Sequence, residues 1–136
     1  MSEQNGKKRV LILDDEPHVV TYLATLLEDN GYDTMTASNG REGMEEIKRS
    51  GRPDLVCLDI SMPEESGIRF YRNLKEDPDL ASVPVLVVTA VTGYGGDPEP
   101  FKRFISTRKQ VPAPEGFLSK PIDQQEFLDT IRQILS

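Results

Sequence analysis

The sequence contains one cysteine, Cys57, among its 136 residues. A single cysteine can form neither an internal disulfide nor a structural zinc cluster, and this usage fits a reducing cytoplasm. Cys57 lies inside a short apolar run, where a thiol usually packs as a small hydrophobic group. We therefore interpret Cys57 as a buried structural residue and not as a reactive one.

Long apolar runs and an excess of basic charge are also missing. No run approaches the ~18–20 apolar residues that a membrane span needs, and the polar residues 1–8 contain no signal-peptide core. The 16 Lys and Arg residues are outnumbered by 23 Asp and Glu residues, for a net charge of −7. A chain of this charge repels a phosphate backbone, so we expect no nucleic-acid partner and no membrane association.

Short apolar segments alternate with amphipathic ones along almost the whole chain. The predicted strands are residues 9–13, 32–37, 55–58, 84–88 and 117–119. Between and after them, apolar residues recur at helical spacing, and Asp123 is a predicted N-cap of the last helix. Strands that are apolar on both faces and alternate with helices predict a parallel sheet covered on each side. We expect a single domain over residues 9–136 after a polar tail, residues 1–8.

Residues 90–116 interrupt this rhythm. The segment contains four of the ten glycines and four of the ten prolines. Only residues 99–109 show helical spacing, with Pro100 placed for a first turn. We expect one short helix between two loose connections, or a segment without fixed structure.

Polar residues follow four of the predicted strands at the point where each strand ends. Asp14 and Asp15 follow the first strand, Asp59 ends the third, Thr89 ends the fourth, and Lys120 follows the fifth. In an open parallel sheet, ligands bind at the carboxyl ends of the strands. The sequence therefore predicts that three carboxylates, one hydroxyl and one ammonium group lie close together.

The chemistry of this set points to phosphoryl transfer assisted by a divalent cation. Three close carboxylates require a compensating cation, and their hard oxygen atoms suit Mg²⁺ or Mn²⁺ better than zinc. A cation beside Lys120 would stabilise charge on a transferred phosphoryl group, to which Thr89 could donate a hydrogen bond. One carboxylate could then act as the nucleophile and become an aspartyl phosphate.

Four motifs carry a resemblance to a known family. They are residues 11–17 (LILDDEP), 59–63 (DISMP) followed by Gly67, 87–90 (VVTA) and 118–121 (LSKP). With these motifs in this order, the sequence resembles the receiver domain of two-component response regulators, most simply the single-domain chemotaxis-type regulators. The resemblance covers about residues 8–135. It implies a flavodoxin-like (βα)5 fold, a doubly wound parallel sheet with strand order 2-1-3-4-5.

The resemblance also implies the phosphoacceptor and the metal ligands. Asp59 would accept a phosphoryl group from a histidine kinase or a histidine phosphotransfer protein. Asp15, Asp59 and the backbone carbonyl of Ser61 would bind Mg²⁺ directly, while Asp14 would act largely through a water molecule. A receiver catalyses its own phosphorylation and dephosphorylation and is not an enzyme for an outside substrate.

The remaining implied roles concern the response to phosphorylation. Lys120 would pair with the phosphate, Thr89 would move toward it, and Phe117 would be the aromatic switch residue. The Lys120–Pro121 peptide bond would be cis. As a stand-alone receiver, the protein would signal by binding an unidentified downstream protein or by passing the phosphoryl group on. More residues separate Thr89 from Lys120 in the sequence than in the simple family members. The additional residues affect the usual output surface but not the phosphorylation chemistry.

Other interpretations of the same residues stay open at this point. Asp14 and Asp15 are also suited to favour the N-terminus of the first helix through its dipole. The protein could be a small phosphatase with an aspartyl-phosphate intermediate, but such enzymes usually carry a second Asp two residues after the nucleophile. Ser61 occupies that position here. The third interpretation is a phosphorylation-independent interaction module of the same fold.

Overall fold

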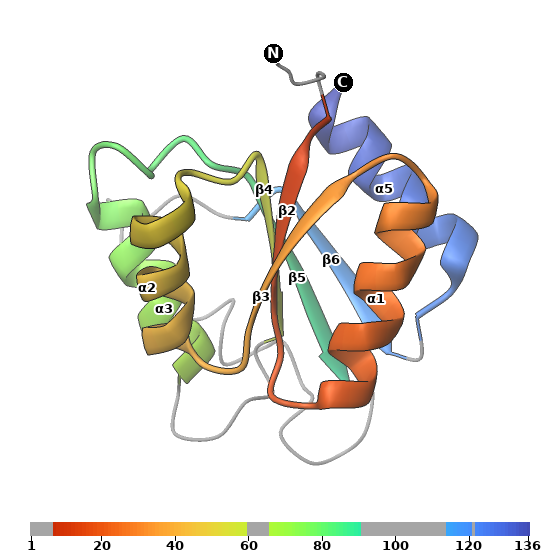
Figure 1. Cartoon of the computed structure of the whole chain (residues 1–136), viewed down its shortest axis with the longest axis horizontal. Helices are drawn as coiled ribbons and strands as arrows, with labels where there is room; N and C mark the ends of the chain where they lie inside the picture. Colours follow the sequence, from red (N-terminus) through yellow and green to blue (C-terminus); the bar gives the residue numbers. More distant parts are fainter. Residues whose placement is uncertain (1–6, 60–65, 91–113, 121) are drawn as a thin grey trace.

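The computed structural model describes residues 7–59, 66–90, 114–120 and 122–136. Five strands and four helices lie in these residues (Figure 1). In chain order they are β2 (Arg9–Leu13), α1 (Pro17–Asp29), β3 (Asp33–Ala37), α2 (Gly40–Ser50), β4 (Leu55–Asp59), α3 (Ser66–Glu76), β5 (Val85–Ala90), β6 (Gly116–Lys120) and α5 (Gln124–Leu135).

The five strands form one parallel sheet in the order β3-β2-β4-β5-β6, which confirms the predicted order 2-1-3-4-5. The chain runs from β2 outward to the edge strand β3 and then returns to β4 on the other side of β2. The direction of winding therefore changes between β2 and β4, where Leu13 pairs with Leu58. In sheets of this class, ligands bind outside the carboxyl ends of the strands at this change of direction.

Apolar side chains on both faces of the sheet explain why helices cover each side. Successive residues of a strand point to opposite faces. Leu11 and Leu13 accordingly belong to a core that includes Phe70 and Tyr71 of α3, whereas Val10 and Ile12 belong to a core with helices α1 and α5. Figure 1 shows α2 and α3 on one side of the sheet and α1 and α5 on the other. All five residues of β4 are buried.

Local signals position the helix ends. The Asn39 side chain accepts a hydrogen bond from the Glu42 N–H at 2.9 Å, and α2 is followed by Gly51 with φ of 98°. Positive φ favours glycine because it lacks Cβ. The Asp123 side chain accepts from the Glu126 N–H at 2.8 Å, which confirms Asp123 as the N-cap of α5. These caps fix the connections that follow the strands.

The predicted strand positions are confirmed with small shifts: β3 and β5 begin one residue later than the sequence pattern suggested, at Asp33 and Val85. The predicted helix at residues 99–109 lies outside the described residues. Within the described residues, no helix is long and apolar enough to cross a membrane.

Candidate functional site

Two carboxylates occupy the position where the winding of the sheet changes direction. Asp14 directly follows β2 and Asp59 is the last residue of the adjacent strand β4, so the sheet itself places them side by side. Their exposed fractions are only 3% and 2%. Asp14 is held further by its N–H, which donates to the Ala37 carbonyl at 3.2 Å, and by its Oδ1, which accepts from the Glu16 N–H at 2.9 Å.

Asp15 completes a group of three carboxylates. Ligand oxygens of Asp14, Asp15 and Asp59 all lie within 4.8 Å of one another, and Asp15 is the exposed member. Two buried acids and one exposed acid provide hard oxygen atoms that are open to solvent on one side, which suits a hydrated Mg²⁺ or Mn²⁺ ion. The residues present therefore fit a divalent cation.

The electrostatics of Asp14 agree with this conclusion. Burial, together with the negative charge of Asp59, raises the pKa of Asp14 to about 6, although the Glu16 N–H and Lys120 act in the opposite direction. A raised carboxyl pKa means that the charged form lacks sufficient compensation where it is buried. An additional positive charge in this group of acids would therefore be stabilising.

Lys120 lies at the same edge of the sheet and contacts three acidic residues. Its Nζ is 3.2 Å from Oδ2 of Asp14, 3.5 Å from Oδ2 of Asp59 and 3.1 Å from Oε1 of Glu16. Burial by itself would lower the pKa of Lys120, but the carboxylates of Asp59 and Asp14 outweigh it, and the net effect is a raised pKa. The ammonium group is therefore charged at neutral pH and fixed beside Asp59.

Glu16 is a site residue to which the sequence interpretation assigned no role. Its carboxylate contacts Lys120, and its backbone N–H orients Asp14. It is also the N-cap residue of α1 but makes no side-chain cap bond, and Pro17 begins the helix. Asp14, for its part, contacts Lys120 and Ala37, so its role is not limited to stabilising the N-terminus of α1 through the helix dipole. The signal in the sequence that could have identified Glu16 was the position of an acidic residue directly after Asp14-Asp15 and before Pro17.

The structure describes the backbone and side chains of the remaining predicted site residues to different extents. Thr89 belongs to β5 and pairs in register with Ser119, next to the Asp59–Val88 pair, but its side chain is outside the described part. Ser61 and Pro121 also lie outside the described residues. Phe117 pairs in register with Val87 and is a half-buried residue packed against the core beneath α2 and α3.

Comparison with known proteins identifies the family. A family model described as the response regulator receiver domain matches residues 10–132. The chain belongs to this receiver family. Among curated relatives, the polar-differentiation response regulator DivK of Brucella anthropi is 35% identical over 128 residues, which covers 94% of this chain and 96% of DivK. DivK of Brucella ovis is 34% identical with the same coverage.

Solved structures of receivers are also similar to this chain. Chemotaxis response regulator CheY4 of Vibrio cholerae is 26% identical with a TM-score of 0.77, covering 95% of this chain and 99% of CheY4. A receiver domain of a signal transduction histidine kinase from Syntrophus aciditrophicus is 30% identical with a TM-score of 0.76, covering 94% and 89% of the two chains. The protein is therefore a response regulator receiver of two-component signalling, as the four motifs suggested.

Proposed function

We propose that Asp59 accepts a phosphoryl group from the phosphohistidine of a histidine kinase or a histidine phosphotransfer protein, and that this changes a surface bound by a downstream protein. The observation that carries the proposal is the position of Asp59. It is a buried carboxylate at the change of winding direction, with Lys120 Nζ 3.5 Å away and two further acids within 4.8 Å. Asp14 shares this setting, and Asp59 is taken as the acceptor because it ends β4 and begins the motif at residues 59–63 that the receiver resemblance assigns to the phosphoacceptor.

In the proposed reaction, a carboxylate oxygen of Asp59 attacks the phosphorus atom in line with the donor nitrogen. The P–N bond breaks, the electron pair stays on the imidazole nitrogen, and a P–O bond to Asp59 forms. Lys120 is already held beside Asp59 by the buried carboxylate of Asp14 and would stabilise the negative charge on the phosphoryl oxygens. Thr89 would donate its hydroxyl to one of those oxygens. Hydrolysis of the resulting acyl phosphate would return Asp59 to its carboxylate form.

Asp14, Asp15 and Asp59, with the backbone carbonyl of Ser61, would hold Mg²⁺ or alternatively Mn²⁺. When bound, the ion supplies positive charge that lowers the repulsion between Asp59 and an incoming phosphoryl group. The raised pKa of Asp14 and the spacing of the three carboxylates support this ligand set.

The proposed switch involves Thr89 and Phe117. Phosphorylation would draw Thr89 toward the new charge, and Phe117 would follow by changing its packing against the core. Phe117 is only partly buried at the edge of that core, which leaves room for such a change. We also propose that the receiver unit comprises residues 9–136, with residues 1–8 as a polar tail and residues 90–116 as an extended segment that contributes to the output surface.

Incubation with acetyl phosphate and Mg²⁺, followed by intact-mass measurement, tests the proposal. The chain should gain one phosphoryl group, and Asp59→Asn should gain none. Asp54→Asn is a matched control, because Asp54 lies at the opposite end of β4 and its Oδ2 accepts from the Arg9 N–H at 2.9 Å. This control should be phosphorylated normally.

Three outcomes would contradict the proposal. Absence of phosphorylation with Mg²⁺ or Mn²⁺ would favour an interaction module that works without phosphorylation. Phosphorylation that persists in Asp59→Asn would place the acceptor elsewhere. Sustained turnover of an added phosphate ester would instead indicate a phosphatase.

A further inference from the structure

Strand β3 forms one edge of the sheet, and its outer side is unpaired within the part of the chain that the structure describes. Among the described strands, it pairs with β2 alone. The Asp33 N–H donates to Lys8, and the Ala37 carbonyl accepts from the Asp14 N–H, so residues 33 and 37 point their backbone groups toward β2. Because alternate residues of a parallel strand bond to opposite sides, Thr34 and Thr36 direct their N–H and C=O groups outward. An edge of this kind is a template for an additional strand.

Three hollows that have lining residues in common make up a groove along this edge. A hollow of about 550 Å³ at the amino-terminal end of β3 is lined by Asp33, Thr34 and Met35. It shares Glu46 with a second hollow of about 270 Å³, which in turn shares Thr36 with a third of about 280 Å³. In Figure 1, β3 crosses between α2 and α1, and these two helices form the walls of the groove.

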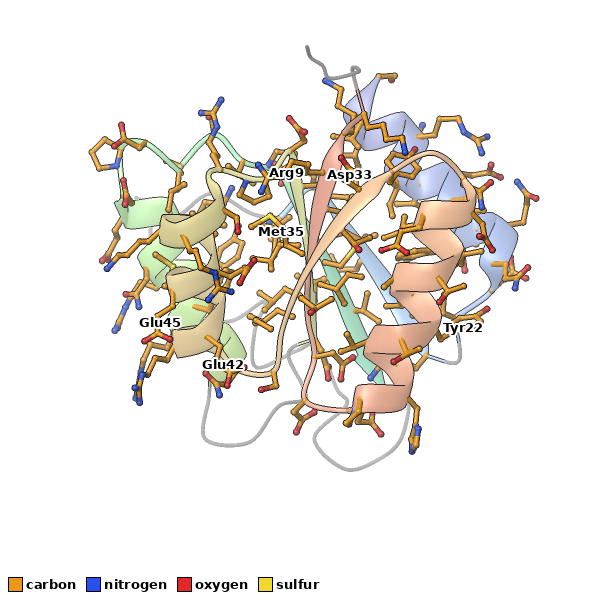
Figure 2. All side chains as sticks on the ribbon, viewed as in Figure 1. Arg9, Tyr22, Asp33, Met35, Glu42 and Glu45 are labelled. Atoms are coloured by element: carbon orange, nitrogen blue, oxygen red, sulfur yellow. The ribbon has the colours of Figure 1, made fainter. Side chains whose placement is uncertain are left out.

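The groove is acidic. Apart from Asp14 and Asp15 of the proposed metal site, five acidic side chains line it: Glu28, Asp33, Glu42, Glu45 and Glu46. The basic residues of the groove are fewer, and two are engaged within the protein. Arg9 donates to the Ser50 carbonyl at 2.8 Å and to the Met35 sulfur at 3.2 Å, and Arg49 pairs with Glu46. Figure 2 shows Asp33 on β3 and Glu42 and Glu45 on α2 along this side of the molecule.

We propose that the β3 edge binds an extended, basic segment of a partner protein as a sixth strand of the sheet. Hydrogen bonds to the outward groups of Thr34 and Thr36 would fix the segment, and its lysine or arginine side chains would meet the acidic walls. A second copy of this chain is a poor occupant because it would bring the same acidic residues into contact with one another. A nucleic acid is repelled by the same charges.

The binding site differs from the phosphorylation site but touches it. The third hollow is lined by Asp14 and Asp15 in addition to Thr36, so a segment that fills the groove ends beside the proposed metal ligands. Binding of the segment and of the cation would then be thermodynamically coupled. The interaction itself does not depend on phosphorylation of Asp59, and either proposal can fail without the other.

The test uses a fluorescent peptide of about nine residues that alternates lysine and valine, a pattern that places lysine on one face of a strand. Anisotropy titration measures its affinity for the full chain at low and high salt. The reference peptides carry proline in place of the central valine, or glutamate in place of each lysine. Amide hydrogen exchange by NMR then shows which backbone groups the peptide covers.

Two variants with matched controls locate the site. Thr34→Pro removes an outward N–H without removing a bond to β2, and Thr34→Val keeps that N–H. Glu45→Lys reverses a charge in the groove, and Asp129→Lys makes the same change on α5, where Asp129 pairs with Arg132. Circular dichroism and phosphorylation of Asp59 report whether each variant folds.

The lysine peptide should bind in a salt-sensitive manner and slow the exchange of the Thr34 and Thr36 amides. Thr34→Pro and Glu45→Lys should each weaken binding about tenfold or more, while the two controls change it little. The proposal is overturned if no binding occurs, if Thr34 and Thr36 stay unprotected in the complex, or if Asp129→Lys weakens binding as much as Glu45→Lys. If Thr34→Pro does not fold, the comparison of Glu45→Lys with Asp129→Lys and the hydrogen-exchange data still test the proposal.

Discussion

The ammonium nitrogen of Lys120 lies 3.5 Å from Oδ2 of Asp59, although 61 positions separate these residues in the chain. They meet because β4 and β6 are parallel neighbours of β5 and end at the same edge of the sheet. Asp14 contacts the same nitrogen at 3.2 Å. Lys120 is therefore already oriented toward Asp59, so little reorganisation would be needed if charge developed on a phosphoryl group bound there.

The first prediction concerns this oriented charge. Lys120→Met should lower the rate of phosphorylation by acetyl phosphate about 10²–10³-fold, because methionine retains much of the side-chain volume but provides no positive charge for the phosphoryl oxygens. Mg²⁺ affinity should rise, since the ammonium group repels a cation bound to the same carboxylates. Quench-flow phosphorylation and Mg²⁺ titration followed by NMR would measure the two effects.

Glu16→Gln is the matched control for this experiment. Glu16 is 59% exposed in its pair with Lys120, and exposed ion pairs contribute little energy. The phosphorylation rate should change less than about threefold in this variant. A loss of Mg²⁺ affinity in Lys120→Met, or equal effects of the two substitutions, would contradict the role assigned to Lys120.

The second prediction concerns the uncompensated charge of Asp14. Asp14→Asn should stabilise the metal-free protein at neutral pH by about 1–2 kcal/mol, because it removes a buried charge whose pKa is raised to about 6. Asparagine preserves the shape of the side chain and its acceptor for the Glu16 N–H. Added Mg²⁺ should raise the urea midpoint of the wild-type protein but have little effect on the variant.

Asp15→Asn provides the comparison. Asp15 is exposed, so the neutral substitution should leave the free energy of unfolding of the metal-free protein within about 0.5 kcal/mol. It should still reduce stabilisation by Mg²⁺ if Asp15 is a ligand. If Asp14→Asn destabilises the metal-free protein, the ion pair between Asp14 and Lys120 contributes more stability than the burial of the Asp14 charge costs.

The order of the strands and the meeting of Asp14, Asp15, Asp59 and Lys120 could be predicted from the sequence. Strands that are apolar on both faces require helices on each side, and parallel strands deliver their final residues to one edge. This rule depends only on where each apolar run ends. It therefore works even though the carboxylate of Asp59 and the ammonium of Lys120 come from distant segments.

Contacts that depend on side-chain direction could not be predicted in this way. Glu16 follows the same strand as Asp14, yet only the structure shows that its carboxylate reaches Lys120. Lys75 lies on α3 among polar residues and is typical of an exposed helix position. In the structure, it is buried because the segment between α3 and β5 folds back over it. Similarly, the groove beside β3 arises from the relative positions of α1 and α2 and has no signature in the sequence.

The third prediction concerns Lys75, whose exposed fraction is 8%. Its ammonium group donates to the Val83 carbonyl at 2.8 Å and to the Ala81 carbonyl at 3.2 Å, and it lies 5.6 Å from the centre of the Tyr71 ring. Lys75→Met should reduce the free energy of unfolding by about 1–3 kcal/mol because two carbonyl groups lose their donor. Urea denaturation would measure the change.

Lys48→Met on α2 is the control for Lys75, since Lys48 is an exposed lysine at a similar place near a helix end. It should change the free energy of unfolding by less than about 0.5 kcal/mol. Phosphorylation of Asp59 should persist in both variants, because Lys75 acts at the other end of β5. Equal stability of Lys75→Met and the wild-type protein would show that the two carbonyls find other donors.

The last prediction concerns alkaline pH and Cys57, a buried thiol in the middle of β4. Burial raises the pKa of this thiol from 9.0 to about 12. The folded protein therefore retains the thiol proton between pH 9 and 12, whereas the unfolded chain loses it. Stability from this residue is present below pH 9 and declines as pH rises through that interval, by about 1.4 kcal/mol per pH unit.

Urea midpoints measured from pH 8 to 10.5 should fall more steeply for the wild-type protein than for Cys57→Ala, which has no group to titrate there. The alanine variant is expected to be less stable at pH 8 because of the smaller side chain, so the slopes and not the absolute values are compared. Parallel slopes would mean that the Cys57 thiol ionises as readily in the folded protein as in the unfolded chain.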